Sequence, residues 1–262
     1  MSKMKLHHMN QIDFQPLVSN FQGTTGIIIK TLDSGSCFQF NPNLVFPAAS
    51  LIELPILWEF FHQCATGSLD LAEEIELQSE DMVIGFGILR QLKPGLKLCL
   101  YDLAVLMTVV SDNTATNLLI DKLGIDNIND SIQRIGLTHT ILQYKMYDSI
   151  STSQDNLTTP SDMLRMLEAF IQDKHLLSKY GDEPLKILEG QQCKNKLHLG
   201  IPKGARLANK TGETLGTEHD IGVLLGREET VIIVVMTTGL SENYQGIELC
   251  RDVARLVYQN TL

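Results

Sequence analysis

The sequence predicts an α+β fold in which an antiparallel sheet, flanked by terminal helices, lies beside an all-helical lobe. β-Branched runs typical of strands occur near both ends of the chain, and the long stretch between them carries apolar residues at helical spacing. The order of strands, helices, strands and a last helix indicates one shared sheet, with a cleft between sheet and lobe. We therefore expect an α/β domain formed by residues 1–48 and 200–262, and an all-helical domain formed by residues 49–199.

The first strands and the first long helix are the clearest local predictions. Thr24 to Thr31 and Cys37 to Phe40 are β-rich runs joined by a polar turn, which predicts a hairpin. From Leu51 to Phe61 apolar residues recur on every side, which is typical of a helix buried all round.

The middle of the chain predicts further helices separated by loops. A short acidic helix is expected from Leu69 to Leu77, followed by a loop at Met82 to Gly87. Apolar spacing predicts a helix from Tyr101 to Val110 and another from Asn113 to Leu123, which ends at Gly124. Downstream we expect a helix beginning at Pro160, a polar passage from Cys193 to Lys203, strands at Arg206–Thr211, Asp220–Leu225 and Thr230–Thr237, and an amphipathic helix from Ser241 to Tyr258.

Composition and charge exclude several classes of partner. With 262 residues, 44% of them hydrophobic and 20% charged, the chain is long enough for a substantial core. The net charge of −10 argues against nucleic acid or an anionic membrane. No apolar run could cross a bilayer, and residues 1–20 lack the apolar core of a signal peptide. The chain as written is therefore expected to be cytoplasmic, with a removed export segment as the alternative.

The cysteines and glycines point to no cofactor or metal. Five cysteines, an odd number without metal-ligand spacing, suit small buried hydrophobes in a reducing compartment: Cys37, Cys64, Cys99, Cys193 and Cys250. The segment Gly85-Phe86-Gly87 alone is no phosphate-binding loop. We expect neither a metal site nor a cofactor.

Three short motifs carry candidate chemistry. Ser50 lies at the opening of the buried helix, and Glu53 is one turn further on the same face, which suits a nucleophile with an ionisable partner or simply a helix cap. Ser111-Asp112-Asn113 joins two predicted helices and could equally be a capping cluster. Lys210-Thr211-Gly212 lies at the end of a predicted strand. It is either part of a functional site or simply a surface lysine followed by a bend.

These motifs resemble those of the class A β-lactamases and related penicillin-binding proteins, in the same order along the chain. The resemblance runs from about Gly23 to the C-terminus and rests on four segments: Phe46–Ser50, Ser111–Ala115, Thr158–Pro160 and Asn209–Gly212. One departure stands out. The first motif of the family is Ser-x-x-Lys, and this sequence has Glu53 at the lysine position.

The resemblance implies a role for each motif residue. Ser50 would be the nucleophile, and Ser111 would relay a proton to the departing nitrogen. Asn113 would hydrogen-bond the substrate's amide side chain, while Lys210 and Thr211 would attract its carboxylate. The backbone N–H of Glu213, the residue after Gly212, would form an oxyanion hole with that of Ser50.

Glu53 is expected to change this machinery. A carboxylate with an ordinary pKa of about 4.3 is a weak base at neutral pH; burial would raise that pKa and a nearby Lys210 would lower it. A salt bridge between Glu53 and Lys210 would quench both groups. The replacement of lysine also changes the local charge by about two units, which disfavours a substrate carboxylate. We expect slowed acylation and weaker binding of anionic β-lactams.

The segment from Gly136 to Pro160 corresponds to the family's Ω-loop, where class A enzymes carry a glutamate that activates the deacylating water. No glutamate occurs there; Asp148 is a weak substitute candidate, and solvated loop acids are the simpler interpretation of Asp148 and Asp155. Deacylation by the usual route is therefore expected to be compromised. His219, on a predicted strand, is expected to be structural.

Three interpretations of function stay open. The first is a serine hydrolase that acts on a β-lactam or a related amide or ester through an acyl-serine and is weak or slow to deacylate. The second is a catalytically impaired family member that binds a ligand or peptide. The third is an introduced substitution at Glu53 in an otherwise competent enzyme. In each case the expected partner is a small molecule, a β-lactam or a peptidoglycan-like peptide, and the expected state is a monomer.

Overall fold

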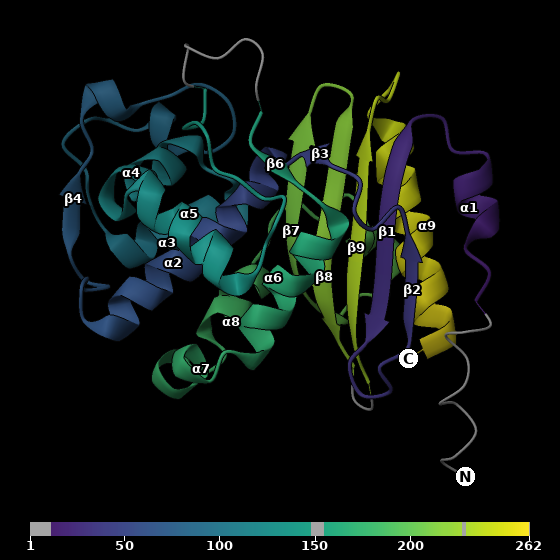
Figure 1. The fold of residues 1–262 in the computed structure, drawn as a ribbon. Coiled ribbons are helices and arrows are strands. Elements are labelled where there is room, and N and C mark those ends of the chain that lie inside the picture. The colour runs from purple at the N-terminus through teal and green to yellow at the C-terminus, as the bar shows by residue number, and fades with distance from the viewer. Residues whose placement is uncertain (1–11, 148–154, 227–228, 262) are drawn as a thin grey trace.

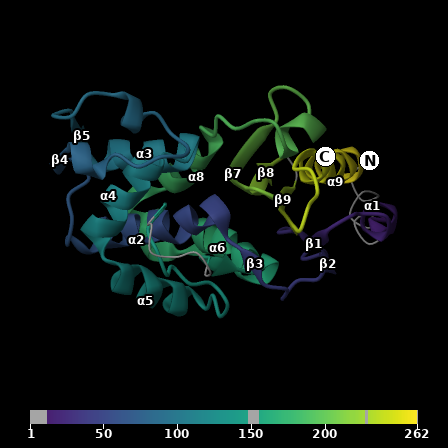
Figure 2. The same ribbon diagram turned by 90° about the horizontal axis from the view of Figure 1, so that it is seen from above.

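The computed structural model of the protein describes residues 12–147, 155–226 and 229–261. A five-stranded antiparallel sheet lies beside a helical lobe, and helices α1 and α9 lie beyond the sheet, on the side away from that lobe (Figures 1 and 2). The predicted α+β architecture is confirmed. The division of the chain into two domains at residues 48 and 200 stays a prediction.

The sheet joins the two ends of the chain, as predicted. Its strand order is β2-β1-β9-β8-β7, so that β1 pairs with β9 although some 200 residues separate them in sequence. The predicted hairpin and the three later strands are all present, and each later strand extends beyond its predicted bounds. The strands are β1 Thr24–Thr31, β2 Cys37–Phe40, β7 Arg206–Thr214, β8 Thr217–Leu225 and β9 Thr230–Thr238.

Both faces of the sheet are buried, because helices cover each of them. In β1, Ile27 and Ile29 pack with α1 (Gln15–Ser19) and α9 (Tyr244–Thr261), whereas Ile28 faces the helical lobe. On that second face α6 (Pro160–Gln172) lies against β1, β8 and β9. The approach is close enough that a Cβ atom on Gly26 would lie 2.5 Å from Cγ of Pro160.

The helical lobe is built around α2 (Glu53–Thr66), which contacts α3 to α8. Burial of α2 on all sides matches the prediction, since apolar residues around its whole circumference have a neighbour to cover them. The helices predicted near Tyr101 and Asn113 are present, whereas α5, α7 and α8 were not predicted. The remaining helices are α3 Leu100–Val110, α4 Asn113–Leu123, α5 Ile125–Ile135, α7 Lys174–Tyr180 and α8 Glu183–Glu189, with short 3-10 turns at Ala49–Ile52 (η2), Ser79–Asp81 (η3), Leu89–Gln91 (η4) and Leu197–Gly200 (η5).

The prediction of a helix from Leu69 to Leu77 is wrong. Part of this segment, Glu74–Glu76, is a short strand, β4, that pairs with β5 (Lys97–Cys99). Two acids alternate with Ile75, so the strand exposes both carboxylates and turns the isoleucine towards the core, which a helix would not achieve. A second short pair, β3 (Phe46–Pro47) with β6 (Leu157–Thr158), leads the chain into Ser50.

The cysteines are all free, and their burial is mixed. Cys64 and Cys250 are buried as predicted, Cys99 and Cys193 are partly buried, and Cys37 is exposed, contrary to the prediction. Cys37 lies on the edge strand β2, where alternate side chains point to solvent. Within the three described ranges, no helix has the length and hydropathy needed to cross a membrane, and no three potential metal ligands cluster together.

Candidate active site

Ser50 lies at a sharp turn between strand and helix. Strand β3 ends at Pro47, the 3-10 turn η2 spans Ala49–Ile52, and α2 follows directly. Ala49, just before the serine, has a positive φ of 44°, a conformation that non-glycine residues seldom adopt. Ser50 is partly exposed and lines a cavity of about 330 Å³. The fold thus presents this hydroxyl to a cavity at the mouth of a buried helix.

The capping alternative for Ser50 is wrong. The residue preceding η2 is Ala48 and that preceding α2 is Ile52, and neither helix start has a side-chain cap. The Ser50 hydroxyl instead lies close enough to Glu53 to lower the pKa of that carboxyl group.

Glu53, Lys210 and Ser111 meet in a buried cluster beside Ser50. Glu53 is 1% exposed and Lys210 is fully buried, and Lys210 Nζ lies 3.1 Å from Glu53 Oε2. The same ammonium group donates hydrogen bonds to Ser111 Oγ at 2.5 Å and to the carbonyl oxygen of Thr211 at 2.9 Å. The salt bridge that the sequence suggested is therefore present, and it links α2 to strand β7.

Burial dominates the electrostatics of Glu53. Neither of its carboxylate oxygens has a partner with hydrogen-bond geometry among the described residues, so the 3.1 Å contact to Lys210 is a charge pair. Burial raises the pKa of Glu53 from 4.5 to about 7, against the opposing effects of Lys210 and the Ser50 hydroxyl. At neutral pH the carboxyl group is consequently present in both protonated and ionised forms.

In the segment Ser111-Asp112-Asn113, one residue caps a helix and another contacts Lys210. Ser111 ends α3 with a positive φ of 50°, and its hydroxyl accepts the bond from Lys210. Asp112 is the residue that caps α4, since its Oδ1 accepts from the N–H of Ala115 at 3.0 Å. The capping alternative is therefore correct for Asp112.

Asp112 also fixes the loop above the cavity, which sequence reasoning missed. Its Oδ2 accepts hydrogen bonds from the N–H groups of Ile88 at 2.6 Å and Leu89 at 2.8 Å, in a side chain that is 1% exposed. Asn113 holds the same loop, because its Nδ2 donates to the carbonyl of Ile84 at 3.2 Å. Asn113 lines the Ser50 cavity, and so does Phe86, which belongs to this loop.

Strand β7 also borders the cavity, and its Gly212 lets the strand approach the Ser50 turn closely. A Cβ atom at Gly212 would lie 3.3 Å from both the Ala48 carbonyl oxygen and the Ala49 Cβ. Glu213, the next residue, lines the cavity together with Thr214. The backbone after Gly212 therefore runs beside the turn that carries Ser50, as an oxyanion hole requires. Thr211, between Lys210 and Gly212, is 5% exposed.

His219 anchors this turn to the sheet. Its Nδ1 accepts from the N–H of Thr237 at 3.1 Å, which leaves Nε2 as the protonated nitrogen, 2.8 Å from the carbonyl oxygen of Pro47. Full burial lowers the pKa of His219 to about 4, so the ring is neutral at physiological pH. Both ring nitrogens serve backbone groups, which fits the structural role expected for this residue.

Lys196 is a second buried cation that sequence reasoning missed. It lies in the passage predicted to be polar, yet it is fully buried behind β7, where it pairs with Glu218 and lies 3.6 Å from Glu213 Oε2. Its ammonium group also donates to the carbonyl oxygens of Gly212 and His219. A lysine in a polar run gives no sequence signal for such burial.

Within the loop between residues 136 and 160, described residues on both sides of its undescribed part line the cavity, and Asn156 is tied to the Ser50 turn. The backbone carbonyl of Asn156 accepts from the N–H of Ala48 at 2.6 Å, and its side-chain Oδ1 accepts from the N–H of Gln143 at 2.7 Å. Asp155 is exposed and is the carboxylate that this loop's described residues contribute to the cavity lining. Asp148, the other candidate, lies outside the described residues.

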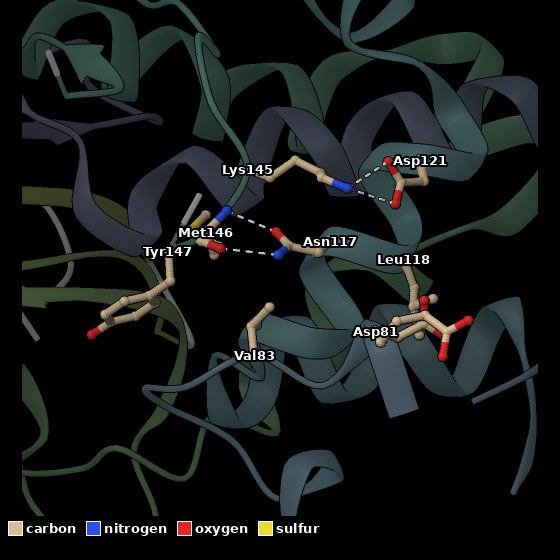
Figure 3. Close-up of a pocket in the computed structure, with 9 residues that line it drawn as sticks. Asp81, Val83, Asn117, Leu118, Asp121, Lys145, Met146 and Tyr147 are labelled. Atoms are coloured by element: carbon tan, nitrogen blue, oxygen red, sulfur yellow. Dashed lines mark hydrogen bonds and ion pairs between the residues drawn. The ribbon is translucent and has the colours of Figure 1, made fainter. Parts of the chain in front are cut away.

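Asn117 holds the part of the loop that separates this cavity from a second one. Its side chain accepts from the N–H of Met146 at 2.7 Å and donates to the carbonyl of Met146 at 3.0 Å (Figure 3). The second cavity, of about 340 Å³, shares Lys145, Met146 and Tyr147 with the first. Lys145 forms an ion pair with Asp121, at 2.9 Å and 3.0 Å to the two carboxylate oxygens.

Comparison with known proteins gives one family. The sequence matches the Beta-lactamase enzyme family over residues 11–261. The crystal structure of a beta-lactamase from Sphaerobacter thermophilus DSM 20745 is 30% identical, with a TM-score of 0.88 over 95% of this chain and 97% of that one. PBP-A is 32% identical, with a TM-score of 0.86 over 98% and 96% of the two chains. A point mutant of PBP-A was solved as an acyl-enzyme complex with penicillin G. A search of curated proteins returned no match.

Replacing Asp112 by alanine should destabilise the protein by about 3 to 5 kcal/mol, because the α4 cap and the N–H groups of Ile88 and Leu89 all lose their side-chain acceptor. Urea unfolding of the purified variant measures this difference. Asp102→Ala is the matched control: this exposed acid lies in the first turn of α3 and should cost less than about 1 kcal/mol. An equal loss in both variants would contradict the role given to Asp112.

Proposed function

This chain belongs to the beta-lactamase enzyme family, and we propose that it is a serine hydrolase in which Ser50 forms an acyl-enzyme with a β-lactam or a related amide or ester. The observation that carries the proposal is the cluster at one corner of the cavity. Ser50 lies beside Glu53, and Lys210 contacts both Glu53 and Ser111. A nucleophile, a base and a path for a proton are therefore adjacent.

In the acylation step the oxygen of Ser50 attacks the carbonyl carbon of the substrate. The Ser50 proton passes to Glu53, which replaces the lysine of the family motif as general base. The raised pKa of Glu53, about 7, supports this role, because a base is most effective when its pKa lies near the working pH. The bond to the leaving nitrogen or oxygen then breaks, and that atom takes the proton of the Ser111 hydroxyl. Lys210 replaces this proton on Ser111 and regains one from protonated Glu53, so that the proton taken from Ser50 ends on the leaving group.

The developing negative charge on the carbonyl oxygen is stabilised by the backbone N–H groups of Ser50 and Glu213. The close approach of Gly212 to Ala48 and Ala49 supports this pairing. Each donor of this kind contributes on the order of 3 kcal/mol to the transition state. Asn113, which lines the cavity, is proposed to bind the amide side chain of the substrate. Thr211, next to Lys210 in sequence, is proposed to bind the substrate group that corresponds to the carboxylate of a β-lactam.

The same site suggests slow deacylation. Hydrolysis of the acyl-enzyme needs a base that activates water, and the loop segment 144–147, which faces the cavity, contributes no carboxylate. Asp155, the loop carboxylate among the described lining residues, is exposed to solvent. We therefore propose that the acyl-enzyme accumulates.

A second candidate function is a ligand-binding protein without turnover. The observation in its favour is the Glu53–Lys210 charge pair, which ties up the two ionisable groups nearest Ser50. This candidate predicts reversible binding and no covalent adduct.

Incubation with penicillin G and, separately, with its neutral methyl ester should add the mass of the intact probe to the protein, as seen by intact-protein mass spectrometry. The adduct should persist for many minutes, because no loop glutamate is present to clear it, and it should be lost in Ser50→Ala. An adduct that survives in Ser50→Ala would exclude Ser50 as the nucleophile. Adduct formation only in Glu53→Lys would show that Glu53 disables the site and would favour the binding protein.

The rate of acylation by the neutral probe should fall about tenfold for each pH unit below 7. Glu53 gains a proton as the pH drops through its raised pKa of about 7, and the neutral acid cannot accept the Ser50 proton. Single-turnover rates measured between pH 4 and 8 test this directly. Glu53→Gln should react slowly across this range. A wild-type midpoint near 4.5 would contradict the raised pKa of Glu53, and an unchanged rate in Glu53→Gln would contradict its role as the base.

A further inference from the structure

The Lys210 ammonium group is already engaged by the protein itself, through two hydrogen bonds and one charge pair. A lysine ammonium group carries three N–H bonds. At Lys210 three acceptors surround it: Ser111 Oγ at 2.5 Å, the Thr211 carbonyl oxygen at 2.9 Å and Glu53 Oε2 at 3.1 Å. The side chain is also fully buried, and its charge is offset by that of Glu53.

The other cations near the cavity are paired as well. Lys196, behind β7, is buried against Glu218 and lies 3.6 Å from Glu213. Lys145, which lines the cavity, has both carboxylate oxygens of Asp121 within 3.0 Å. No arginine lines the cavity in the part of the chain that the structure describes. Among the lining residues that the structure describes, an anionic ligand therefore finds no uncompensated cation.

Two acidic residues belong to the cavity lining instead. Asp155 is exposed, and the Glu213 side chain is 40% exposed although its Oε2 lies 3.6 Å from Lys196, whose charge Glu218 already balances. Glu53 cancels the charge of Lys210, which leaves Asp155 and Glu213 as the excess charges of the lining, in a protein whose net charge is −10. Acidic residues at the cavity raise the free energy of a bound carboxylate, because the charges repel. They stabilise a bound cation and leave the free energy of a neutral ligand almost unchanged.

The cavity wall offers apolar surface in place of charge. Phe86 is 42% exposed and Tyr147 is 59% exposed, and both line the cavity together with Tyr144 and Met146. Ile84, on the same loop as Phe86, is 63% exposed. Exposed aromatic and aliphatic groups around a cavity are typical of a surface that binds apolar ligand groups.

We propose that this cavity selects acyl donors without negative charge, namely neutral esters or amides with an apolar or aromatic group, and that Glu53, Asp155 and Glu213 set this preference. The inference rests on the proposed function, because it assumes that Ser50 is acylated. With an ester, the bond from Ser50 oxygen to the acyl carbon forms as the bond to the alcohol oxygen breaks. The alcohol leaves with the proton relayed by Ser111. Water later releases the acyl group as a carboxylate, which the surrounding acids repel from the cavity.

Penicillin G and its methyl ester provide a matched pair of probes that differ by one charge. The ratio of their acylation rates should favour the ester by at least about tenfold in the wild-type protein. The ratio should fall in Asp155→Asn and in Glu213→Gln, and should reverse in Glu53→Lys, where the local charge changes by two units. Asp126→Asn, an exposed acid on α5, is the control and should leave the ratio unchanged.

A ratio near one, or one that favours the anion in the wild-type protein, would overturn the charge preference while leaving Ser50 acylation intact. A preference for the ester that stays constant in Asp155→Asn, Glu213→Gln and Glu53→Lys would overturn the assignment to these residues. Absence of an adduct with both probes would instead remove the proposed function itself. Asp155 and Glu213 are exposed, so their variants test the inference even if Glu53→Lys fails to fold.

Discussion

The buried charge pair between Glu53 and Lys210 is the interaction on which the site depends. Glu53 opens helix α2, the centre of the helical lobe, and Lys210 lies on strand β7 at the edge of the sheet. Two charges taken out of water are costly unless each compensates the other, and removal of one would leave the other buried without a partner. The pair therefore joins lobe and sheet at the point where Ser50 faces the cavity, and it sets the protonation of the group nearest that hydroxyl.

Around this pair, separate contacts fix the backbone of the Ser50 turn. His219 binds the carbonyl of Pro47, and Asn156 accepts from the N–H of Ala48. On the facing strand, Gly212 lets the chain pass within van der Waals distance of Ala48 and Ala49. Together these contacts account for the positive φ at Ala49, because a strained conformation persists only where its surroundings hold it. The result is a preorganised corner in which small displacements would separate the nucleophile from its base.

Periodicity and motif order were sufficient to predict the architecture from the sequence, because alternating or helical apolar spacing reports directly on burial. The same reasoning failed at Leu69 to Leu77, where three residues of strand lie within an acidic stretch that resembles a helix. It also could not find Lys196, since burial of a lysine depends on Glu218, whose position is set by the fold alone. Ser50, Glu53, Ser111 and Lys210 were identified by their motifs, but the contacts between them and the role of Asp112 in holding the Ile88 loop required the structure.

Burial and Lys210 together determine the ionisation of Glu53 in this account. Carbon-13 NMR of protein labelled at the glutamate carboxyl carbons, assigned by comparison with Glu53→Gln, would follow the titration of this group directly. We predict a midpoint near pH 7 in the wild-type protein and a higher midpoint in Lys210→Met, because the cation lowers the pKa that burial raises. A midpoint near 4.5, or one that does not move when Lys210 is replaced, would contradict the claim.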